Sequence, residues 1–350
     1  MRNKIFLIVI IIISSYVGYI FISTGFFKSI DNNFDGKILK KINVPGAEDI
    51  TVNHIDSFAI ISSTHRKKFP ATEQEYGGLY FLDLKNLDKN PVLLTRDFKK
   101  PFAPHGISIY SQNNETTIAA INHTYEGEFI ELFKLIENKA IHYKTLKNKL
   151  IYSPNDIVLV DEESFYFTND HGYKEGFPRL VEDYLGLPFS NVVYYNSKTN
   201  FIEVASNISY ANGINYDSKR KLIFVASPRK FEILVYERKY DNSLKFIENI
   251  SCGTGVDNIE FDLNGDLWVG AHPNLLHFNS YIDGKNKISP SEIINIKYKT
   301  KQDHIVNQIY IEEGNEMSGS TVAAPFGNLI LVANVKDNYF LVLKKNWLGW

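Results

Sequence analysis

Residues 211–238 read ANGINYDSKRKLIFVASPRKFEILVYER, and this stretch contains the unit from which the fold can be predicted. It opens with a polar dipeptide, Asn212-Gly213, which leads into a short and mostly apolar segment. Two longer apolar segments of strand length follow at 221–227 and 232–238, with the turn-forming pair Ser227-Pro228 between them. Because short apolar runs bounded by turn residues are typical of β-strands, the stretch predicts three successive strands.

The same three-part pattern occurs six times along the chain, at intervals of 45 to 63 residues. Self-similarity at such a period, with several strands per unit, is typical of a β-propeller. A large β-sandwich would also space its strands regularly, but it would not repeat a polar dipeptide at one relative position. The sequence therefore predicts an all-β fold, a six-bladed β-propeller over 29–350. The six dipeptides are Glu48-Asp49, His105-Gly106, Asn155-Asp156, Asn212-Gly213, Asp257-Asn258 and Ser320-Thr321. The two strands after each dipeptide are expected first at 57–63, 116–122, 164–170, 221–227, 266–272 and 328–334, and then at 78–84, 128–134, 191–196, 232–238, 275–279 and 339–344.

The composition is that of a globular protein, and it excludes several functions. The 350 residues carry 38 Lys and Arg against 40 Asp and Glu, so the basic surface that nucleic-acid binding needs is absent. Cys252 is the only cysteine, which excludes an internal disulfide framework and a cysteine-based zinc or iron–sulfur site. We expect Cys252 to be a packing residue rather than a nucleophile.

The chain begins with an apolar segment that predicts one N-terminal transmembrane helix. Residues 5–27 contain no charge, and Arg2 and Lys4 precede them. A helix of this length can span a bilayer core of about 30 Å. We therefore expect residues 1–28 to be an uncleaved signal anchor, with the N-terminus inside and the propeller outside the cytoplasm, in the periplasm or at the cell surface if the source is bacterial. Cleavage near residues 23–25 is the alternative, and it would release a secreted protein.

The repeated dipeptides predict a cation site. In a propeller the first strand of each blade lines the central channel, so the dipeptides should converge there. Four carboxylates in one channel would repel each other strongly unless a cation lay among them. The side chains offer only oxygen ligands, which suit a hard cation, and their number suits Ca²⁺ better than Mg²⁺. The residues are Glu48, Asp49, Asn155, Asp156, Asn212, Asp257 and Asn258. Asx residues also begin strands and cap turns, which is the plainer explanation for any single dipeptide.

Four histidines occupy related places in the repeats. His105 belongs to a dipeptide and should lie beside the cation, where it could act as a general base. His123, His171 and His272 each end the strand that follows the dipeptide, and any one of them alone is more simply a hydrogen-bonding residue. The sequence lacks G-x-S-x-G, H-E-x-x-H and the glycine motifs of phosphate-binding loops. An α/β serine hydrolase, a zincin and a nucleotide-binding protein therefore have no support.

The same segments resemble the paraoxonase/arylesterase family. The matching motifs are collinear over about residues 36–343 and so cover the whole part beyond the apolar segment. They are GAEDI (46–50), PHGIS (104–108), NHTYEGEFIELFK (122–134), PNDIV (154–158), FTNDH (167–171), YLGLPFSNVVYYN (184–196), ANGIN (211–215), VDNIEFDLNGDLWVGAHPN (256–274) and GSTVAAP (319–325). The resemblance implies a six-bladed propeller with two calcium ions in its channel.

The resemblance also implies which residues form the site. The catalytic calcium would be held by Glu48, Asn155, Asn212, Asp257 and Asn258. The structural calcium would be held by Asp49, Asp156 and the carbonyl oxygen of Ile107. His105 and His123 would form a catalytic dyad, with Asp257 as a rival candidate for the base. Asp170, His171 and His272 match further polar residues near the two ions.

The function that the resemblance implies is calcium-dependent hydrolysis of lactones and aryl esters. In it, Ca²⁺ polarises the carbonyl group and the histidine dyad activates water. The partner would be a small-molecule substrate, and no obligate protein partner is inferred. Two alternatives stay open. One is a non-catalytic, calcium-stabilised propeller that binds a ligand or a partner protein, and the other is a related calcium propeller that hydrolyses sugar lactones or has a strictosidine-synthase-like scaffold.

Two departures from the family set further expectations. Animal members have a disulfide that joins the N-terminal region to the last blade, and this chain has no cysteine at either place. We therefore expect the last blade to close by strand pairing alone. Segment 65–75 matches the family's active-site lid poorly, so the size of the substrate stays open.

Overall fold

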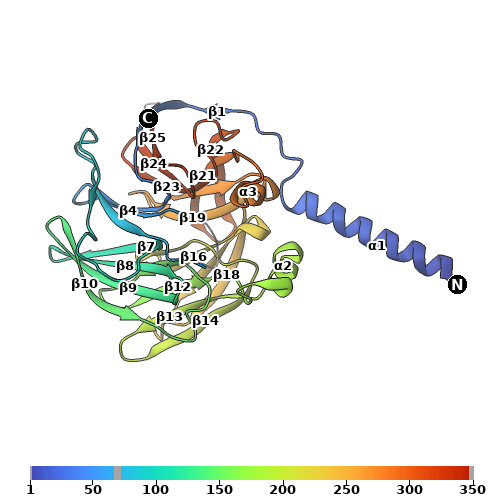
Figure 1. Ribbon diagram of the computed structural model, residues 1–350, viewed down its shortest axis with the longest axis horizontal. Coiled ribbons are helices and arrows are strands. Elements are labelled where there is room, and N and C mark those ends of the chain that lie inside the picture. Colours follow the sequence, from blue (N-terminus) through green and yellow to red (C-terminus); the bar gives the residue numbers. More distant parts are fainter. Residues whose placement is uncertain (1, 67–71, 347–350) are drawn as a thin grey trace.

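Each of the six sequence repeats folds into one antiparallel sheet, and the sheets are the blades of a six-bladed β-propeller (Figure 1). The computed structural model describes residues 2–66 and 72–346. The predicted all-β, six-bladed fold is confirmed. Blade 1 consists of β3 (Ala47–Asn53), β4 (Phe58–Thr64), β5 (Gly77–Asp83) and β6 (Val92–Leu93). Blade 2 consists of β7 (Pro104–Gln112), β8 (Glu115–Thr124), β9 (Gly127–Ile136) and β10 (Lys139–Leu146). Blade 3 consists of β11 (Pro154–Leu159), β12 (Phe165–Asn169), β13 (Ser190–Asn196) and β14 (Asn200–Ile208). Blade 4 consists of β15 (Ile214–Asp217), β16 (Leu222–Ser227), β17 (Glu232–Arg238) and β18 (Leu244–Ser251). Blade 5 consists of β19 (Gly255–Phe261), β20 (Leu267–His272), β21 (Ser291–Thr300), β22 (Asp303–Glu312) and β1 (Asn33–Phe34), and blade 6 of β23 (Ser320–Phe326), β24 (Leu329–Asn334), β25 (Phe340–Lys345) and β2 (Gly36–Ile42).

The two ends of the chain close the propeller. Strand β2 pairs antiparallel with β25, so blade 6 combines one N-terminal strand with three C-terminal strands. Strand β1 pairs with β22 at the outer edge of blade 5. Closure by strand pairing is therefore confirmed. Cys252 packs against the core between blades 4 and 5, and burial raises the pKa of its thiol to about 12, in agreement with the expected packing role.

The core lies between neighbouring blades. In β12, Phe165 and Phe167 are fully buried and pack with residues of blade 2 such as Ile121. Tyr166, which lies between them in the sequence, packs on the other side with blade 4 residues such as Ile223. Successive side chains of a strand point to opposite faces, so a blade that is covered on both faces needs a continuous apolar run. The middle strands of the blades can therefore be recognised in the sequence as continuous apolar runs.

One expected strand is a helix. The apolar run at 275–279 suggests a strand, but it begins helix α3 (Leu275–Ile282), and the third strand of blade 5 is β21 instead. The side chain of Asn274 accepts a hydrogen bond from the backbone N–H of His277 (3.0 Å) and so caps the N-terminus of the helix. A short apolar run has no period that separates strand from helix, and the cap decides here.

A second helix, α2 (Gly176–Leu185), was not expected from the sequence. It ends at Gly186, whose φ of 60° is the left-handed conformation that terminates many helices. Helices α2 and α3 follow the second strands of blades 3 and 5, β12 and β20. Because the second strands end where the first strands begin, both helices lie at the end of the propeller that carries the dipeptides.

The N-terminal apolar segment forms helix α1 (Arg2–Ser23), and a short 3₁₀ turn, η1 (Pro228–Lys230), lies in blade 4. Helix α1 is long and apolar enough to cross a membrane, and it projects away from the propeller (Figure 1). Beyond its end, the carbonyl oxygen of Thr24 accepts a hydrogen bond from the N–H of Leu275 (2.9 Å), and Lys28 pairs with Glu292 (2.8 Å). These features fit either a membrane anchor or a signal sequence.

Candidate active site and metal-binding channel

The polar dipeptides lie at breaks in the pairing between the first and second strands of their blades. In blade 1, Ala47 and Ile50 of β3 pair with β4, whereas Glu48 and Asp49 between them do not. Blades 2, 3 and 5 have the same break at 104–107, 154–157 and 256–259, and in blade 6 it falls one residue later than expected, at 320–323. In blade 4 the dipeptide immediately precedes β15. Bulges of this kind bend a strand and redirect its side chains, so the dipeptides occupy equivalent places at one end of the channel.

Two glycines bring neighbouring dipeptides together. A Cβ atom on Gly106 would lie 2.5 Å from the carbonyl oxygen of Asn155 and from the Cα of Asp156. A Cβ atom on Gly213 would lie 2.4 Å from the carbonyl oxygen of Asp257. Any larger residue would push the blades apart, because real Cβ atoms essentially never approach other heavy atoms closer than 3.0 Å. Blade 2 therefore meets blade 3, and blade 4 meets blade 5, at the dipeptides themselves.

The two histidines of the expected dyad are hydrogen-bonded to each other. His105 Nδ1 lies 2.8 Å from His123 Nε2, and both side chains are buried. The other ring nitrogen of His105, Nε2, lies 2.9 Å from Glu48 Oε1, to which Asn258 Nδ2 donates at 3.4 Å. The dyad and two of the residues expected to hold the catalytic calcium therefore form one connected group.

Asp257 is linked to two further residues of the expected site. Its Oδ2 lies 2.8 Å from His272 Nε2, and its carboxylate also accepts a hydrogen bond from Asn212. The ring of His272 stacks on Phe278 of α3, with centroids 3.6 Å apart and an interplanar angle of 17°. Helix α3 thus fixes the histidine that holds the Asp257 carboxylate.

The side chain of Asn155 is held by a row of hydrogen-bonded groups that runs through Asp170 and His171 to Asp183 of α2. Its Nδ2 donates to Asp170 Oδ2 (3.2 Å), and Asp170 Oδ1 lies 2.7 Å from His171 Nδ1. His171 Nε2 in turn lies 2.6 Å from Asp183 of α2. Burial lowers the pKa of His171, but the two carboxylates outweigh it and raise that pKa to about 9. The charged imidazole therefore ties α2 to Asn155 at neutral pH.

Four buried side-chain oxygens at this end of the channel have no hydrogen-bond partner among the described residues. They are Glu48 Oε2, Asn155 Oδ1, Asn212 Oδ1 and Asn258 Oδ1. An unsatisfied buried polar group costs about 1–3 kcal/mol, and one hard cation with oxygen ligands would satisfy several at once. No three His, Cys, Asp or Glu side chains within 2–66 and 72–346 form a metal-binding group by themselves, so a cation here would also need the amide oxygens as ligands. The donor chemistry fits Ca²⁺.

A second pair of carboxylates connects the blades. Asp49 Oδ2 accepts the N–H of Ile107 (2.8 Å), and Asp156 Oδ2 accepts the N–H of Ile214 (2.7 Å), so each joins its own blade to the next. Burial raises the pKa of Asp49 well above its ordinary value, and the nearby charges of Asp156 and Glu48 add to this effect. Burial likewise raises the pKa of Asp156. A cation between the two carboxylates would remove the repulsion. That the carbonyl oxygen of Ile107 joins them as a ligand stays a prediction.

The environment of His105 keeps its ring uncharged. Burial and the neighbouring guanidinium of Arg66 lower the pKa of His105 to about 4, against the opposite effect of Glu48. A neutral imidazole has a lone pair on one nitrogen, which is the state that a general base needs.

Two residues that were not among the predicted site residues also contact the dyad. Arg66 Nη1 lies 3.1 Å from His105 Nε2, and Glu128 Oε2 lies 2.5 Å from His123 Nδ1. Glu128 is directly opposite His123 in the pairing of β8 with β9, so a correct register for that hairpin would have indicated it. Arg66 had no such signal. It precedes 67–71, which lie outside the described residues of the expected lid segment.

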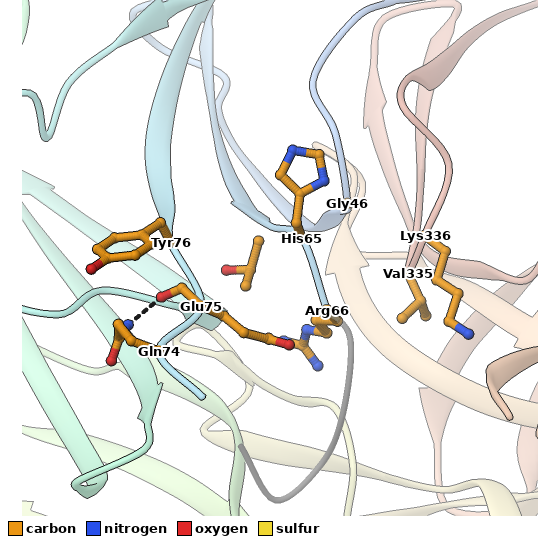
Figure 2. A pocket seen from close by; sticks show the side chains of 9 residues that line it. Gly46, His65, Arg66, Gln74, Glu75, Tyr76, Val335 and Lys336 are labelled. Carbon is orange, nitrogen blue, oxygen red and sulfur yellow. Dashed lines mark hydrogen bonds between the residues drawn. The ribbon is translucent and has the colours of Figure 1, made fainter. Parts of the chain in front are cut away.

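A cavity of about 570 Å³ opens next to this group (Figure 2). Arg66 lines the cavity and also contacts His105, so one residue connects the cavity wall to the dyad. Figure 2 shows the side chains of Arg66 and Glu75 extending toward each other, whereas Lys336 points away. The Lys336 ammonium donates instead to the carbonyl oxygen of Tyr281 in α3 (3.1 Å). The volume is that of a small-molecule site.

Comparison with known proteins identifies the family. The arylesterase family model matches residues 27–340. Serum paraoxonase/arylesterase 2 of Gallus gallus is 33% identical over 301 residues, and serum paraoxonase/arylesterase 1 of Homo sapiens is 34% identical over 302 residues. Each alignment covers 83% of this chain and 83% of the relative.

Solved structures share the fold at low identity. A luciferin-regenerating enzyme superposes with a TM-score of 0.54 at 13% identity, covering 89% of this chain and 94% of that one. Regucalcin from Agrobacterium tumefaciens superposes with a TM-score of 0.52 at 14% identity, covering 90% of this chain and 96% of that one. These likenesses concern the propeller alone. The family model and the relatives cover nearly all of the chain beyond α1, and the chain therefore belongs to the arylesterase family.

Proposed function

We propose that this protein is a calcium-dependent hydrolase of lactones and aryl esters that acts on small molecules. Its relatives are named paraoxonase/arylesterase, which supports hydrolysis of esters or lactones. The observation that carries the calcium requirement is the set of four buried oxygens without partners among the described residues, which come from four different blades. Of their residues, Glu48 contacts His105 and Asn258 contacts Glu48. A cation bound among these oxygens would satisfy them together, which supports the calcium requirement.

The proposed channel holds two ions. The catalytic ion takes Glu48, Asn155, Asn212, Asp257 and Asn258, and the structural ion takes Asp49, Asp156 and the carbonyl oxygen of Ile107. When bound, the catalytic ion would polarise the substrate carbonyl and stabilise the negative charge that develops on its oxygen. Asp170, His171 and His272 support the ligands Asn155 and Asp257 through the contacts described above.

His105 is the proposed general base. His123 holds its Nδ1, so that Nε2 is directed to the group around Glu48. As a water oxygen attacks the carbonyl carbon, the water proton moves to His105 Nε2. The bond between that carbon and the alkoxy oxygen then breaks, and His105 returns the proton to the leaving oxygen. The products are an acid and an alcohol, or a hydroxy acid from a lactone. Asp257 is the alternative base, although His272 already engages its Oδ2.

We expect His105→Gln to lower kcat for lactones by about 10²- to 10⁴-fold, because general-base catalysis contributes that much. Calcium content and melting temperature should stay close to those of the wild type, since the glutamine still fills the site. Steady-state kinetics on a δ-lactone measure the effect. His142→Gln, which alters a histidine in β10, is the matched control and should keep wild-type turnover. A His105→Gln variant with unchanged kcat would show that another group, such as Asp257, is the base.

We also propose that α1 anchors the protein in a membrane, with the propeller outside the cytoplasm. Arg2 and Lys4 precede the apolar stretch and favour an inside N-terminus. Lys28 and Thr24, just past α1, contact the propeller and would be separated from the helix by cleavage. The full-length protein should stay in the membrane pellet after alkaline carbonate extraction, and protease added outside should digest the propeller. Release of an intact, shortened protein would show that the segment is a cleaved signal.

A further inference from the structure

A buried carboxylate ends the hydrogen-bonded row that begins at His105. Glu128 Oε2 lies 2.5 Å from His123 Nδ1, and His123 Nε2 lies 2.8 Å from His105 Nδ1. All three residues are 8% exposed. We propose that Glu128 is a positioning residue for the hydrolytic base, so that His105, His123 and Glu128 act as a three-membered relay. This inference rests on the proposed function, in which His105 is the base.

The hairpin between β8 and β9 places Glu128 by its backbone. Glu128 pairs directly with His123 across the two strands. Directly opposite residues have Cβ atoms about 4.5–5.5 Å apart, so a carboxylate and an imidazole can meet without a strained side chain. Two hydrogen bonds stabilise the turn between β8 and β9. Thr124 Oγ1 donates to the carbonyl oxygen of Gly127 (2.9 Å) and accepts the N–H of Glu126 (3.1 Å). The contact is therefore part of the fold of the hairpin.

The carboxylate of Glu128 favours one direction of hydrogen bonding along the row. An ionised carboxylate only accepts, so His123 Nδ1 carries the hydrogen and donates to Glu128. A neutral His123 then has its lone pair on Nε2, which accepts from His105 Nδ1. His105 then has its lone pair on Nε2, which lies 2.9 Å from Glu48 Oε1. Because a carboxylate cannot donate to that lone pair, this direction requires the proposed cation to take up the Glu48 carboxylate. At the other end Arg66 Nη1, which only donates, lies 3.1 Å from that Nε2 and fits the same direction, whereas the contact with Glu48 Oε1 by itself favours a hydrogen on Nε2.

The opposite direction would disable the base. If His123 donated through Nε2, His105 would accept at Nδ1 and carry its hydrogen on Nε2, where it could not take a proton from water. The carboxylate also stabilises the positive charge that the two rings share once His105 has accepted the proton. In the Ser-His-Asp triad, an amide in place of the carboxylate lowers kcat about 10⁴-fold by favouring the wrong tautomer. Here a second imidazole separates the carboxylate from the base, so we expect a smaller effect.

Strand β9 contains a matched control. Glu131 is also buried and also contacts a histidine, because its Oε2 lies 2.8 Å from His142 Nε2. It accepts further hydrogen bonds from Thr145 Oγ1 (2.6 Å) and Asn122 Nδ2 (3.2 Å). Its histidine and threonine partners belong to β10, the outer strand of the blade. Glu131→Gln therefore tests the loss of a buried carboxylate–histidine pair that is not part of the relay.

The experiment uses the full-length protein in detergent with saturating Ca²⁺, as wild type, Glu128→Gln, Glu128→Asp and Glu131→Gln. We expect Glu128→Gln to lower kcat for a δ-lactone by about 10- to 100-fold with KM unchanged. Glu128→Asp, which keeps the charge, should recover about 10-fold of this loss. Calcium content should match the wild type in all variants. The ¹⁵N resonances of the His123 ring should show hydrogen on Nδ1 in the wild type and a mixture of both tautomers in Glu128→Gln.

The outcomes separate this inference from the proposed function. If the wild type shows calcium-dependent turnover that His105→Gln removes, while Glu128→Gln keeps the wild-type kcat, the relay is wrong and the function stands. If Glu128→Gln and Glu131→Gln lose turnover, calcium and thermal stability to the same extent, Glu128 is only structural and the relay is also wrong. If the wild type has no calcium-dependent turnover, the proposed function is wrong, and the relay, which depends on it, is wrong as well.

Discussion

Replacing Asp257 by asparagine is expected to lower the turnover of phenyl acetate and of lactones by about 10³-fold. Asp257 is the only carboxylate besides Glu48 in the set proposed for the catalytic ion. The substitution keeps the size of the side chain, and the amide oxygen can still accept from His272 Nε2, which now lies 2.8 Å from the Asp257 carboxylate. What is lost is the negative charge. A weaker hold on the ion removes the stabilisation of charge on the carbonyl oxygen, and one such interaction contributes about 10²–10³-fold.

Calcium binding should weaken in parallel. Isothermal titration of the chelated protein with Ca²⁺ should show that the affinity of one of the two sites falls in Asp257→Asn, while the other stays. Asp241→Asn alters an exposed aspartate in the loop before β18 and is the control that should change neither quantity. Two unaltered calcium sites in Asp257→Asn would contradict the assignment of Asp257 as a ligand, and full turnover would contradict its role in catalysis, including that of an alternative base.

The second large effect concerns stability, and it should change sign with calcium. Without the ion, Asp49 and Asp156 are buried carboxylates whose pKa values are raised, and Asp156→Asn removes one charge from them. In excess chelator the variant should therefore melt at or above the wild-type temperature. With Ca²⁺ the wild type gains about 4 kcal/mol at a ligand concentration of about 1,000 Kd, or about 5–10 °C, and the variant should lose most of this gain.

Differential scanning calorimetry of the wild type, Asp156→Asn and Asp241→Asn, each with and without Ca²⁺, measures the effect. The amide oxygen of the variant can still accept the N–H of Ile214, which Asp156 accepts at 2.7 Å, so the link between blades 3 and 4 is preserved. Asp241→Asn is again the control. Its melting temperature should differ from that of the wild type by the same amount in chelator and in Ca²⁺. The same melting difference between Asp156→Asn and the wild type in chelator and in Ca²⁺ would mean that Asp156 only joins the blades and holds no ion.

The repeat was sufficient to predict the architecture from the sequence. Both faces of a blade are covered, so the middle strands are continuous apolar runs such as 221–227 and 328–334, and the polar dipeptides stand out against them. The repeat does not determine which strand completes a blade. The strand that closes blade 6, β2, is separated from β25 by nearly the whole chain, and no local pattern indicates that pairing.

The site was predictable where it coincides with the repeat, and not where it depends on neighbouring elements. Equivalent dipeptides had to converge, and the structure does bring Glu48, Asn258 and His105 into contact. Glu128 was missed because its role depends on the register of one hairpin, and a shift of one residue would point it to the other face. Helix α3 was missed because its apolar run has the length of a strand and only the Asn274 cap distinguishes it.

The most direct test of calcium-dependent hydrolysis is an activity assay of the full-length protein in detergent. Phenyl acetate and a set of γ- and δ-lactones are assayed first with Ca²⁺, then with excess chelator, and again after Ca²⁺ is restored. We expect turnover that the chelator abolishes and that Ca²⁺ restores. Turnover that the chelator leaves unchanged would contradict the calcium mechanism. No turnover from a folded, calcium-loaded protein would contradict the proposed enzyme and favour a propeller that binds a ligand or a partner.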